Sequence, residues 1–494
     1  MEPKSKFYRW LEMIPGSLVW VTFALAIILS FVRPLWVMYF IILFDLYWLF
    51  RIAYFLFFLV VSLRRYRRAI RTDWLAKARE LPGFGALRHL IFLPTYKEDI
   101  EIIRTTLKIL AASAYPMREQ AIVVLAGEAR DRERFAAAAA VLEKEFAGQF
   151  LKFLVTIHPQ DLPDEIPGKG SNLNWSGREA QKFIDGMGCR YEDVIVSSFD
   201  VDTCVHRQYF ACLAHAYLTN PEPTRSSYQP VALYNNNIWE ASWFVRVAAF
   251  GTTFWLMTEL ARPERLFTFA SHSMPFRMLV DVGFWQKDIV TEDSRIFLQG
   301  LLRYGGDYRV TPLYVPVSMD TVMAGHWRRD LVNLYKQQRR WAWGVEHFPF
   351  LVNAFRRDAA IPWRTKLYHL FTLTEGMFSW ATAPLLMFVL GYLPLWTASA
   401  DLKTAVFYQN TPHTLEAIMR LSMGGVLLMA AFSFLLLPPR PAHRRRRDMA
   451  VMVLQWLAVP ITFILFGAIP AIDAQTRLML GRYLGFNVTE KKRI

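Results

Sequence analysis

The sequence predicts an α/β domain with a mixed, largely parallel sheet, inserted between α-helical membrane segments. Hydrophobic residues make up 54% of the 494 residues and charged residues 20%. This balance is too apolar for a typical soluble enzyme and too charged for a membrane bundle alone. Apolar runs long enough to cross a bilayer lie towards both ends. Between them, short β-branched runs alternate with helical stretches, which is typical of a parallel sheet.

The first segment, residues 1–63, is predicted to be a transmembrane hairpin. Ser17–Val32 and Leu35–Leu63 are its two spans, with Arg33 and Pro34 at the outer turn. Basic clusters mark the cytoplasmic ends of spanning helices, and one follows directly: Arg64, Arg65, Arg67, Arg68 and Arg71. We therefore expect an integral protein of the inner or plasma membrane, with the chain after Arg64 in the cytosol.

Residues 64–325 form the predicted cytosolic α/β domain. Leu90–Leu93, Ala121–Leu125 and Val194–Phe199 are expected strands, and Asp131–Phe146 is an expected helix. Residues 326–365 are basic and aromatic and are predicted to be interfacial helices.

Residues 366–494 are predicted to hold further spans, at about Leu367–Leu395, Ala417–Leu437 and Met449–Ile472. Three spans here would leave the C-terminus outside, whereas the basic run Lys491–Arg493 favours the inside. Met449–Ile472, interrupted by two prolines, is our candidate for a re-entrant or interfacial segment.

The net charge of +15 lies largely in clusters beside apolar segments. Such clusters contact anionic lipid, and no nucleic-acid-binding motif accompanies them. Membrane lipid is therefore an expected partner and nucleic acid is not. The three cysteines show neither a metal-binding spacing nor a disulfide framework.

Two carboxylates, Asp200 and Asp202, follow an apolar strand one residue apart. Ligands of an open α/β sheet bind beyond the carboxyl ends of its strands. Carboxylates there could hold Mg²⁺ or Mn²⁺, which would neutralise a diphosphate. A solvated turn is the simpler explanation of this short pattern alone.

Two further segments carry polar side chains towards the same edge. Thr95, Tyr96 and Glu98 end the first strand and could bind a base or ribose, although an ordinary proline-containing turn fits as well. Gly168–Asn174 (GKGSNLN) is predicted to be a glycine-flexed loop whose Lys169 and backbone N–H groups suit phosphate. A plain surface loop explains it equally.

Two motifs come later in the chain. Thr291-Glu292-Asp293 precedes a helical run; Thr291 could be a helix cap, or Asp293 could be a general base. Gln337, Arg340 and Trp341 belong to a QxxRW string. It could be an interfacial helix with an aromatic belt, or Arg340 could bind phosphate and Trp341 stack on a sugar.

In this order and between membrane segments, the motifs PTYKE, KGSNLN, FDVD, TED and QxxRW closely resemble the family 2 glycosyltransferases that include cellulose, chitin and hyaluronan synthases. The resemblance covers roughly residues 88–345. It extends to Phe486–Lys491 (FNVTEK), which is similar to a string of bacterial cellulose synthases.

The resemblance implies a GT-A fold, a UDP-sugar donor, a divalent metal and inversion at the anomeric carbon. It implies that Asp293 is the catalytic base and that Asp202 binds the metal. The implied nucleotide and diphosphate contacts are Thr95, Tyr96, Glu98, Glu128, Lys169, Asp200 and Arg340, and the implied acceptor contacts are Glu292, Gln337 and Trp341.

The sequence departs from the family after the second strand, where an aspartate pair is usual. Here Glu128 and Asp131 stand instead, and either could replace the base-binding aspartate. The chain also stops soon after FNVTEK, so we expect no cyclic di-GMP regulation of the bacterial cellulose kind.

The leading hypothesis is an inverting membrane glycosyltransferase that builds, and could translocate, a β-linked polysaccharide. The second is transfer of a single sugar to a lipid acceptor, such as a polyprenyl phosphate or a glycolipid. A transporter or scaffold would leave the ordered motif set unexplained. The sequence does not identify the sugar, the linkage or the oligomeric state.

Overall fold

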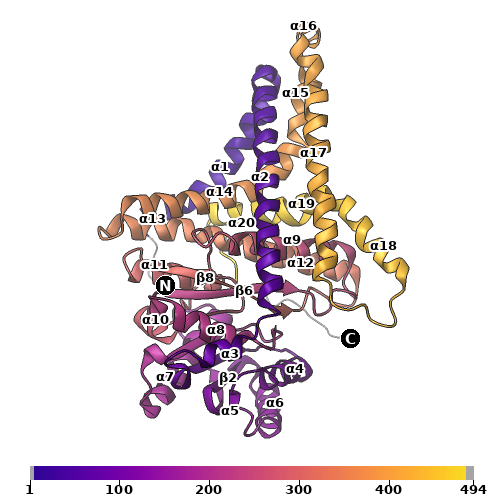
Figure 1. Ribbon diagram of the computed structural model, residues 1–494. Coiled ribbons are helices and arrows are strands. Elements are labelled where there is room, and N and C mark those ends of the chain that lie inside the picture. Colours follow the sequence, from indigo (N-terminus) through magenta and orange to yellow (C-terminus); the bar gives the residue numbers. More distant parts are fainter. Residues whose placement is uncertain (1–4, 486–494) are drawn as a thin grey trace.

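The computed structural model describes residues 5–485 and has two parts (Figure 1). An α/β unit lies on one side, and long helices project from it on the other. Short helices lying crosswise separate the two parts. The prediction of an α/β domain inserted between helical segments is therefore confirmed.

A single eight-stranded sheet forms the centre of the α/β unit, in the order β3-β2-β1-β4-β7-β6-β8-β5. The pairs β1–β2, β1–β4, β2–β3 and β6–β8 are parallel. The pairs of β7 with β4 and β6, and of β5 with β8, are antiparallel. The sheet is thus mixed and mostly parallel, as predicted. Its strands are β1 Arg88–Pro94, β2 Ala121–Glu128, β3 Lys152–His158, β4 Val194–Ser198, β5 Cys204–Val205, β6 Ser226–Tyr234, β7 His272–Pro275 and β8 Arg309–Met319.

The three predicted strands are observed as β1, β2 and β4, the last ending at Ser198 rather than Phe199, and they are buried on both faces. This explains why they appear in the sequence as continuous apolar runs rather than alternating ones. β1 pairs with β2 on one side, Leu93 opposite Leu125, and with β4 on the other, Phe92 opposite Ser198. Their carboxyl ends therefore meet at one edge, where ligands of such sheets bind.

Helices cover both faces of the sheet. The predicted helix at Asp131–Phe146 is observed as α6, Arg132–Glu145. The other helices of this unit are α3 Trp74–Arg79, α4 Ile100–Ala111, α5 Met117–Gln120, α7 Lys169–Met187, α8 Tyr209–Thr219, α10 Phe276–Asp281 and α11 Glu292–Arg303.

A second set of helices lies between the α/β unit and the projecting helices. It contains α9 Trp243–Leu260, α12 Trp327–Ala342, the 3₁₀ turn η5 Trp343–Glu346 and α13 His347–Arg357. Of these, α12, η5 and α13 belong to residues 326–365, and α12 carries the QxxRW string.

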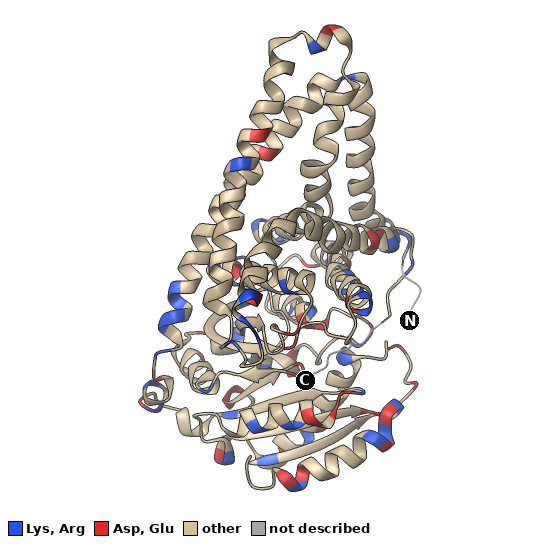
Figure 2. Cartoon of the chain, turned by 90° about the vertical axis from the view of Figure 1, so that its right-hand side faces the viewer, with Lys and Arg blue, Asp and Glu red and all other residues tan. Residues whose placement is uncertain are grey.

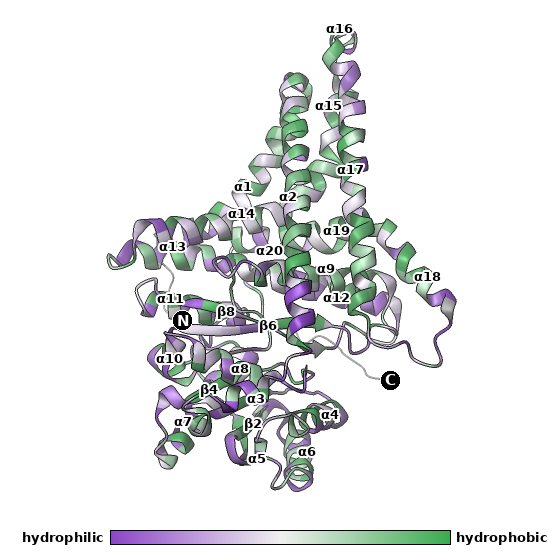
Figure 3. Cartoon of the chain, in the orientation of Figure 1, coloured by the Kyte–Doolittle hydropathy of each residue, from purple (hydrophilic) through white to green (hydrophobic). Residues whose placement is uncertain are grey.

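Among the described residues, four helical runs are long and apolar enough to cross a membrane. A fifth would be the pair α14 Trp363–Phe388 and Leu390–Thr397 (η6 and α15), bent by 45°. Figure 2 shows few charges in the projecting part, and Figure 3 shows it largely hydrophobic, with a hydrophilic patch near the base of α2. The four runs are α1 Lys6–Val32, α2 Pro34–Ala69, α17 Val406–Leu436 and the combined run Arg447–Met479.

The predicted hairpin is observed as α1 and α2, but α1 begins at Lys6, well before the expected Ser17. Pro15 lies inside α1 without ending it. A short helix, α16 Ala400–Lys403, lies between α15 and α17 at the far end of the projecting part.

The run that contains the predicted span Met449–Ile472 does not stand parallel to α17. It comprises α18 Arg446–Leu454, α19 Val459–Phe463, a π-helical turn at Ile464–Ala468 and α20 Ile469–Met479, and lies crosswise in Figure 1. On α20, Asp473 accepts hydrogen bonds from Arg339 Nη1 (2.9 Å) and the Tyr335 hydroxyl (3.0 Å) of α12. These hydrogen bonds attach the end of the run to the helix that carries the QxxRW string. The FNVTEK string lies outside the described residues.

Candidate functional site

The site begins with the two carboxylates that follow β4. Asp200 and Asp202 lie in the turn after this strand, and Asp202 is buried. One carboxylate oxygen of Asp202 accepts the backbone N–H of Asp320 at 2.8 Å. Asn236 Nδ2 donates to the Asp202 carbonyl at 3.2 Å and to Asp320 Oδ1 at 2.9 Å. The segment after β8 therefore holds the Asp202 side chain, and the segment after β6 holds its backbone carbonyl.

Lys169 is the first residue of α7, so the predicted loop is in fact the first turn of a helix. Ser171 Oγ accepts the N–H of Gly168 at 3.2 Å, and Asn172 Nδ2 donates to the Ala126 carbonyl at 2.8 Å. A Cβ on Gly170 would lie 3.0 Å from the Gln286 carbonyl oxygen. The glycine thus allows this turn to approach the segment before α11, and helix formation follows from tertiary contacts rather than propensity.

The Lys169 ammonium brings three sequence motifs together. Its Nζ lies 2.7 Å from Asp200 Oδ1 and 2.9 and 3.0 Å from the two carboxylate oxygens of Asp293. Burial alone would lower the pKa of Lys169, but the carboxylates of Asp200 and Asp293 outweigh it and raise that pKa. The ammonium is therefore held in its charged form between the two acids.

The third carboxylate beside Lys169 belongs to Glu292, whose Oε1 lies 3.8 Å from Nζ. Glu292 is 3% exposed, and burial, followed by the adjacent charge of Asp293, raises its pKa. Asp293 is more open, with a side chain 23% exposed. Asp293 is therefore more accessible to a ligand than Glu292.

Thr95, Tyr96 and Glu98 form a tight turn after β1. The Thr95 hydroxyl donates to Glu98 Oε2 at 2.7 Å, and the Tyr96 backbone N–H donates to the same oxygen. The Thr95 backbone N–H donates to the Ala126 carbonyl at 2.9 Å, the same oxygen that accepts from Asn172. The PTYKE and KGSNLN segments therefore meet at the end of β2.

The two acids after β2 have different surroundings. Glu128 is 3% exposed and paired with Arg130, whose guanidinium lies 4.3 Å from the Tyr96 ring centroid. Burial raises the pKa of Glu128, and the hydrogen bond from Arg130 acts in the opposite direction. Asp131 instead pairs with Arg134 and accepts the Lys97 backbone N–H at 3.2 Å. Asp131 therefore supports the turn that carries Tyr96, whereas Glu128 lies with Arg130 against the ring.

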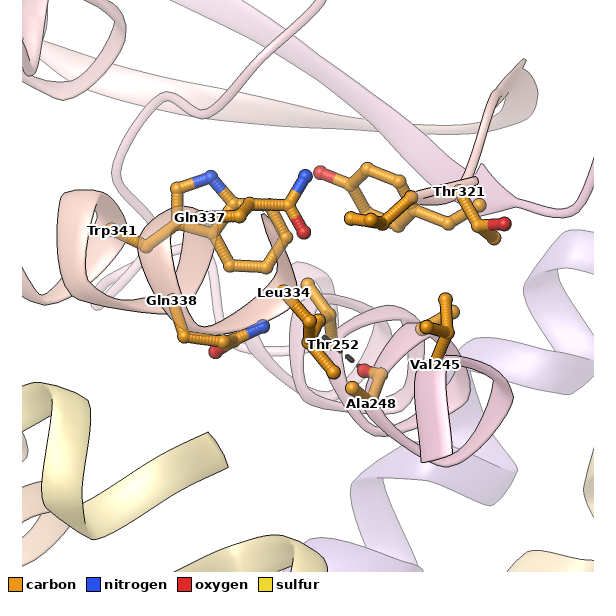
Figure 4. A pocket seen from close by; sticks show the side chains of 11 residues that line it. Val245, Ala248, Thr252, Thr321, Leu334, Gln337, Gln338 and Trp341 are labelled. Carbon is orange, nitrogen blue, oxygen red and sulfur yellow. Dashed lines mark hydrogen bonds between the residues drawn. The ribbon is translucent and has the colours of Figure 1, made fainter. Parts of the chain in front are cut away.

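The QxxRW string lies on α12 and faces α9 across a small cavity. Gln337 and Trp341 line it from α12, and Ala248 and Thr252 line it from α9 (Figure 4). Its volume is about 10 Å³, close to the space that one water molecule needs. Arg340 acts electrostatically on Glu292, which brings the string next to the TED motif.

Tyr234 is a site residue that the sequence analysis missed. It ends β6, lines the same cavity, and its ring centroid lies 5.7 Å from that of Trp341. Burial, and then the carboxylates of Asp200 and Asp202, raise the pKa of its hydroxyl. An apolar run ending in Tyr234 and followed by three asparagines marks a strand end, a signal that could have found this residue.

A divalent metal fits this site only if a bound substrate supplies some of its oxygen ligands. Among residues 5–485, no three His, Cys, Asp or Glu side chains are grouped so that they could hold a metal ion. Mg²⁺ is commonly bound by one or two carboxylates together with substrate phosphates. Asp202, with Asp200 beside it, meets that requirement.

One protein family matches this chain. Residues 195–469, more than half of the chain, match the family described as glycosyl transferase family group 2. No curated protein matches the sequence.

Among solved structures, the mannosyltransferase PcManGT from Pyrobaculum calidifontis, in complex with GDP-Man and Mn²⁺, is 16% identical, with a TM-score of 0.43, over 78% of this chain and 99% of its own. TarS 1-349 from S. aureus is 13% identical, with a TM-score of 0.37, over 81% of this chain and 94% of its own.

Proposed function

The chain belongs to glycosyl transferase family group 2, and we propose that it is an inverting, membrane-bound glycosyltransferase that uses a UDP-sugar donor. The observation that carries this proposal is the convergence on Lys169 of Asp200 after β4 and Asp293 at the start of α11. A cation that could bind a diphosphate therefore lies next to a carboxylate that could accept a proton. This is the minimum that direct displacement at an anomeric carbon requires.

In the proposed reaction, an acceptor hydroxyl oxygen attacks the anomeric carbon while the bond from that carbon to the diphosphate breaks. Asp293 takes the hydroxyl proton, and the electron pair of the broken bond leaves on the diphosphate. Lys169 and Arg340 stabilise that developing charge. A divalent metal held by Asp202 would add positive charge beside the same oxygens. Glu292 lines the acceptor side.

We assign the nucleotide to the region between β1 and β2. Thr95, Tyr96 and Glu98 supply a rigid turn, and the Tyr96 ring offers a stacking surface that Arg130 occupies from one side. We infer that Glu128, rather than Asp131, is the carboxylate that binds the base of the nucleotide. Asp131 is engaged in supporting the turn.

We propose a growing β-linked glycan as the acceptor. Trp341 and Tyr234 supply two neighbouring aromatic rings, and Tyr234 lies within electrostatic range of Asp293. Aromatic faces suit sugar rings. The projecting helices would anchor the enzyme in the inner or plasma membrane, with the α/β unit in the cytosol, because the arginines at the end of α2 follow the positive-inside pattern.

A single sugar transferred to a lipid acceptor is the second candidate, favoured by one observation. The cavity beside Trp341 holds about 10 Å³, which is far too small for a saccharide without movement of α9 or α12. A lipid acceptor that reached the site along the membrane surface would not have to pass through this cavity.

The test uses purified enzyme in detergent with a panel of nucleotide sugars, with and without Mn²⁺ or Mg²⁺. Released nucleotide and product size are both measured. Metal-dependent transfer from a UDP-sugar supports the proposal, and a polymer distinguishes the first acceptor from the second. Absence of transfer from every donor would overturn it.

A further inference from the structure

The threonine before the catalytic acids does not cap its own helix. Thr291 occupies the N-cap position of α11, but its side chain makes no capping hydrogen bond. Its hydroxyl donates instead to Glu346 Oε1. The other carboxylate oxygen of Glu346 accepts the indole N–H of Trp343 at 2.9 Å. One carboxylate thus joins the residue two positions before Asp293 to the turn that follows Trp341.

A second set of contacts runs beside the first. His347 Nδ1 accepts from Arg295 Nε at 3.1 Å, so its Nε2 carries the hydrogen and donates to Ser294 Oγ at 2.7 Å. Burial, and then the Arg295 charge, lower the pKa of His347, which keeps the ring neutral. The Arg295 guanidinium also lies 3.9 Å from the Phe350 ring centroid. The first turn of α11 is therefore attached to η5 and α13 through side chains.

We propose that Glu346 is a positioning residue for the transfer reaction, one that holds Asp293 in register with the acceptor surface at Trp341. This inference rests on the proposed function. Lys169 fixes the Asp293 carboxylate on the diphosphate side, but it cannot set the distance to an acceptor that lies against α12. The bond from Thr291 to Glu346 supplies that constraint, because Glu346 follows Trp341 by five residues in the same run of helix.

The expected effect follows from the geometry. A base must lie within about 3 Å of the proton that it removes, and a displacement of 1 Å can cost about 10²-fold in rate. The donor contacts at Lys169 and Asp202 do not involve Glu346. Loss of Glu346 should therefore lower kcat while the donor KM stays nearly constant.

The experiment compares Thr291→Val, Glu346→Leu, their combination and Glu346→Gln in the full-length enzyme. The two single variants should each lose about 10- to 10²-fold in kcat, with donor KM and UDP binding changed less than about twofold. The double variant should lose no more than the worse single one, because both remove the same link. Glu346→Gln should recover most of the rate, since its amide can accept from Trp343 and donate to the Thr291 hydroxyl.

Tyr308→Phe is the matched control. It removes a hydrogen bond of 2.7 Å between the buried Tyr308 hydroxyl, just before β8, and Ser227 Oγ of β6, and should lower thermal stability without changing kcat. Provided that the parent transfers sugar, any of three results would overturn the inference. The single variants could keep near-parental kcat, the losses in kcat could multiply in the double variant, or Tyr308→Phe could lose as much kcat as they do. A parent that transfers none would overturn the proposed function and this inference with it.

Discussion

Lys169 Nζ lies 2.9 and 3.0 Å from the two carboxylate oxygens of Asp293. The cation assigned to the diphosphate and the carboxylate assigned to the acceptor proton are therefore in direct contact. A donor diphosphate that attracts Lys169 would loosen this contact and leave the Asp293 carboxylate oxygens open to the acceptor hydroxyl.

Asp293→Asn should abolish proton removal while keeping the shape of the side chain. We expect a loss of about 10²-fold or more in kcat, the usual contribution of a general base. UDP binding should survive. A folded variant that binds UDP normally and transfers at near-parental rate would leave Asp293 without a catalytic role.

Lys169→Met would leave three carboxylates around one buried position without their cation. Breaking one partner of a buried ion pair costs about 3–5 kcal/mol, an upper limit here because Asp200 and Asp293 are partly exposed. We expect a lower melting temperature and a raised donor KM. Adding Asp200→Asn should restore part of the melting temperature but not the donor affinity. If the melting temperature did not recover, repulsion between the uncompensated carboxylates would not be the cause of the loss.

Asp202→Asn tests the metal separately from the fold. The amide oxygen can still accept the Asp320 N–H, so the variant should fold. Its transfer should fall by at least about 10²-fold, because a bound metal contributes several kcal/mol of charge stabilisation. In the parent, chelation should stop transfer and added Mn²⁺ should restore it. Full activity in excess EDTA would refute the metal assignment.

Two introduced cysteines test the orientation in the membrane, in a background without Cys189 and Cys204. Glu133→Cys lies exposed on α6, and Lys403→Cys lies exposed on α16 at the opposite end of the molecule. In intact cells an impermeant thiol reagent should label Lys403→Cys and not Glu133→Cys. The reverse pattern would place the α/β unit outside, away from cytosolic nucleotide sugars.

His89 on β1 should make the α/β unit sensitive to acid. Burial lowers its pKa from 6.5 to about 3, and its ring nitrogens are buried without hydrogen-bond partners. Below pH 6.5 the unfolded chain binds a proton that the folded protein does not, so stability falls as pH falls. From pH 7 to pH 5 the loss is about 2 kcal/mol. Denaturation of His89→Leu should show a correspondingly smaller loss, and parallel curves would contradict this.

The sequence predicted those parts of the fold whose patterns are local. Runs such as Leu90–Leu93 are buried on both faces, so their composition alone identifies them as strands. β7, His272–Pro275, was not predicted, because it is only four residues long and lacks a regular alternation of apolar and polar residues. Gly168–Asn174 was wrongly predicted to be a loop, because the contacts that make it helical come from residues far along the chain.

The candidate site could likewise be predicted only where its signals are local in the sequence. The residue types of Asp202, Lys169 and Asp293 identified the chemistry, but not their mutual distances, since Lys169 and Asp293 are 124 positions apart. The bond between Thr291 and Glu346 could not be predicted either, because both residues have ordinary local explanations. The helix cap that Thr291 could have formed is not made by its hydroxyl.

The contact between Asp473 on α20 and Arg339 on α12 bears on the order in which the enzyme becomes active during its synthesis. All of the α/β unit and the QxxRW helix leave the ribosome well before Asp473 does. Until then Arg339, one residue from the arginine assigned to phosphate, lacks its counter-charge at 2.9 Å. Ribosome-bound chains that already carry every catalytic motif would therefore still lack the α20 contacts that hold the QxxRW helix.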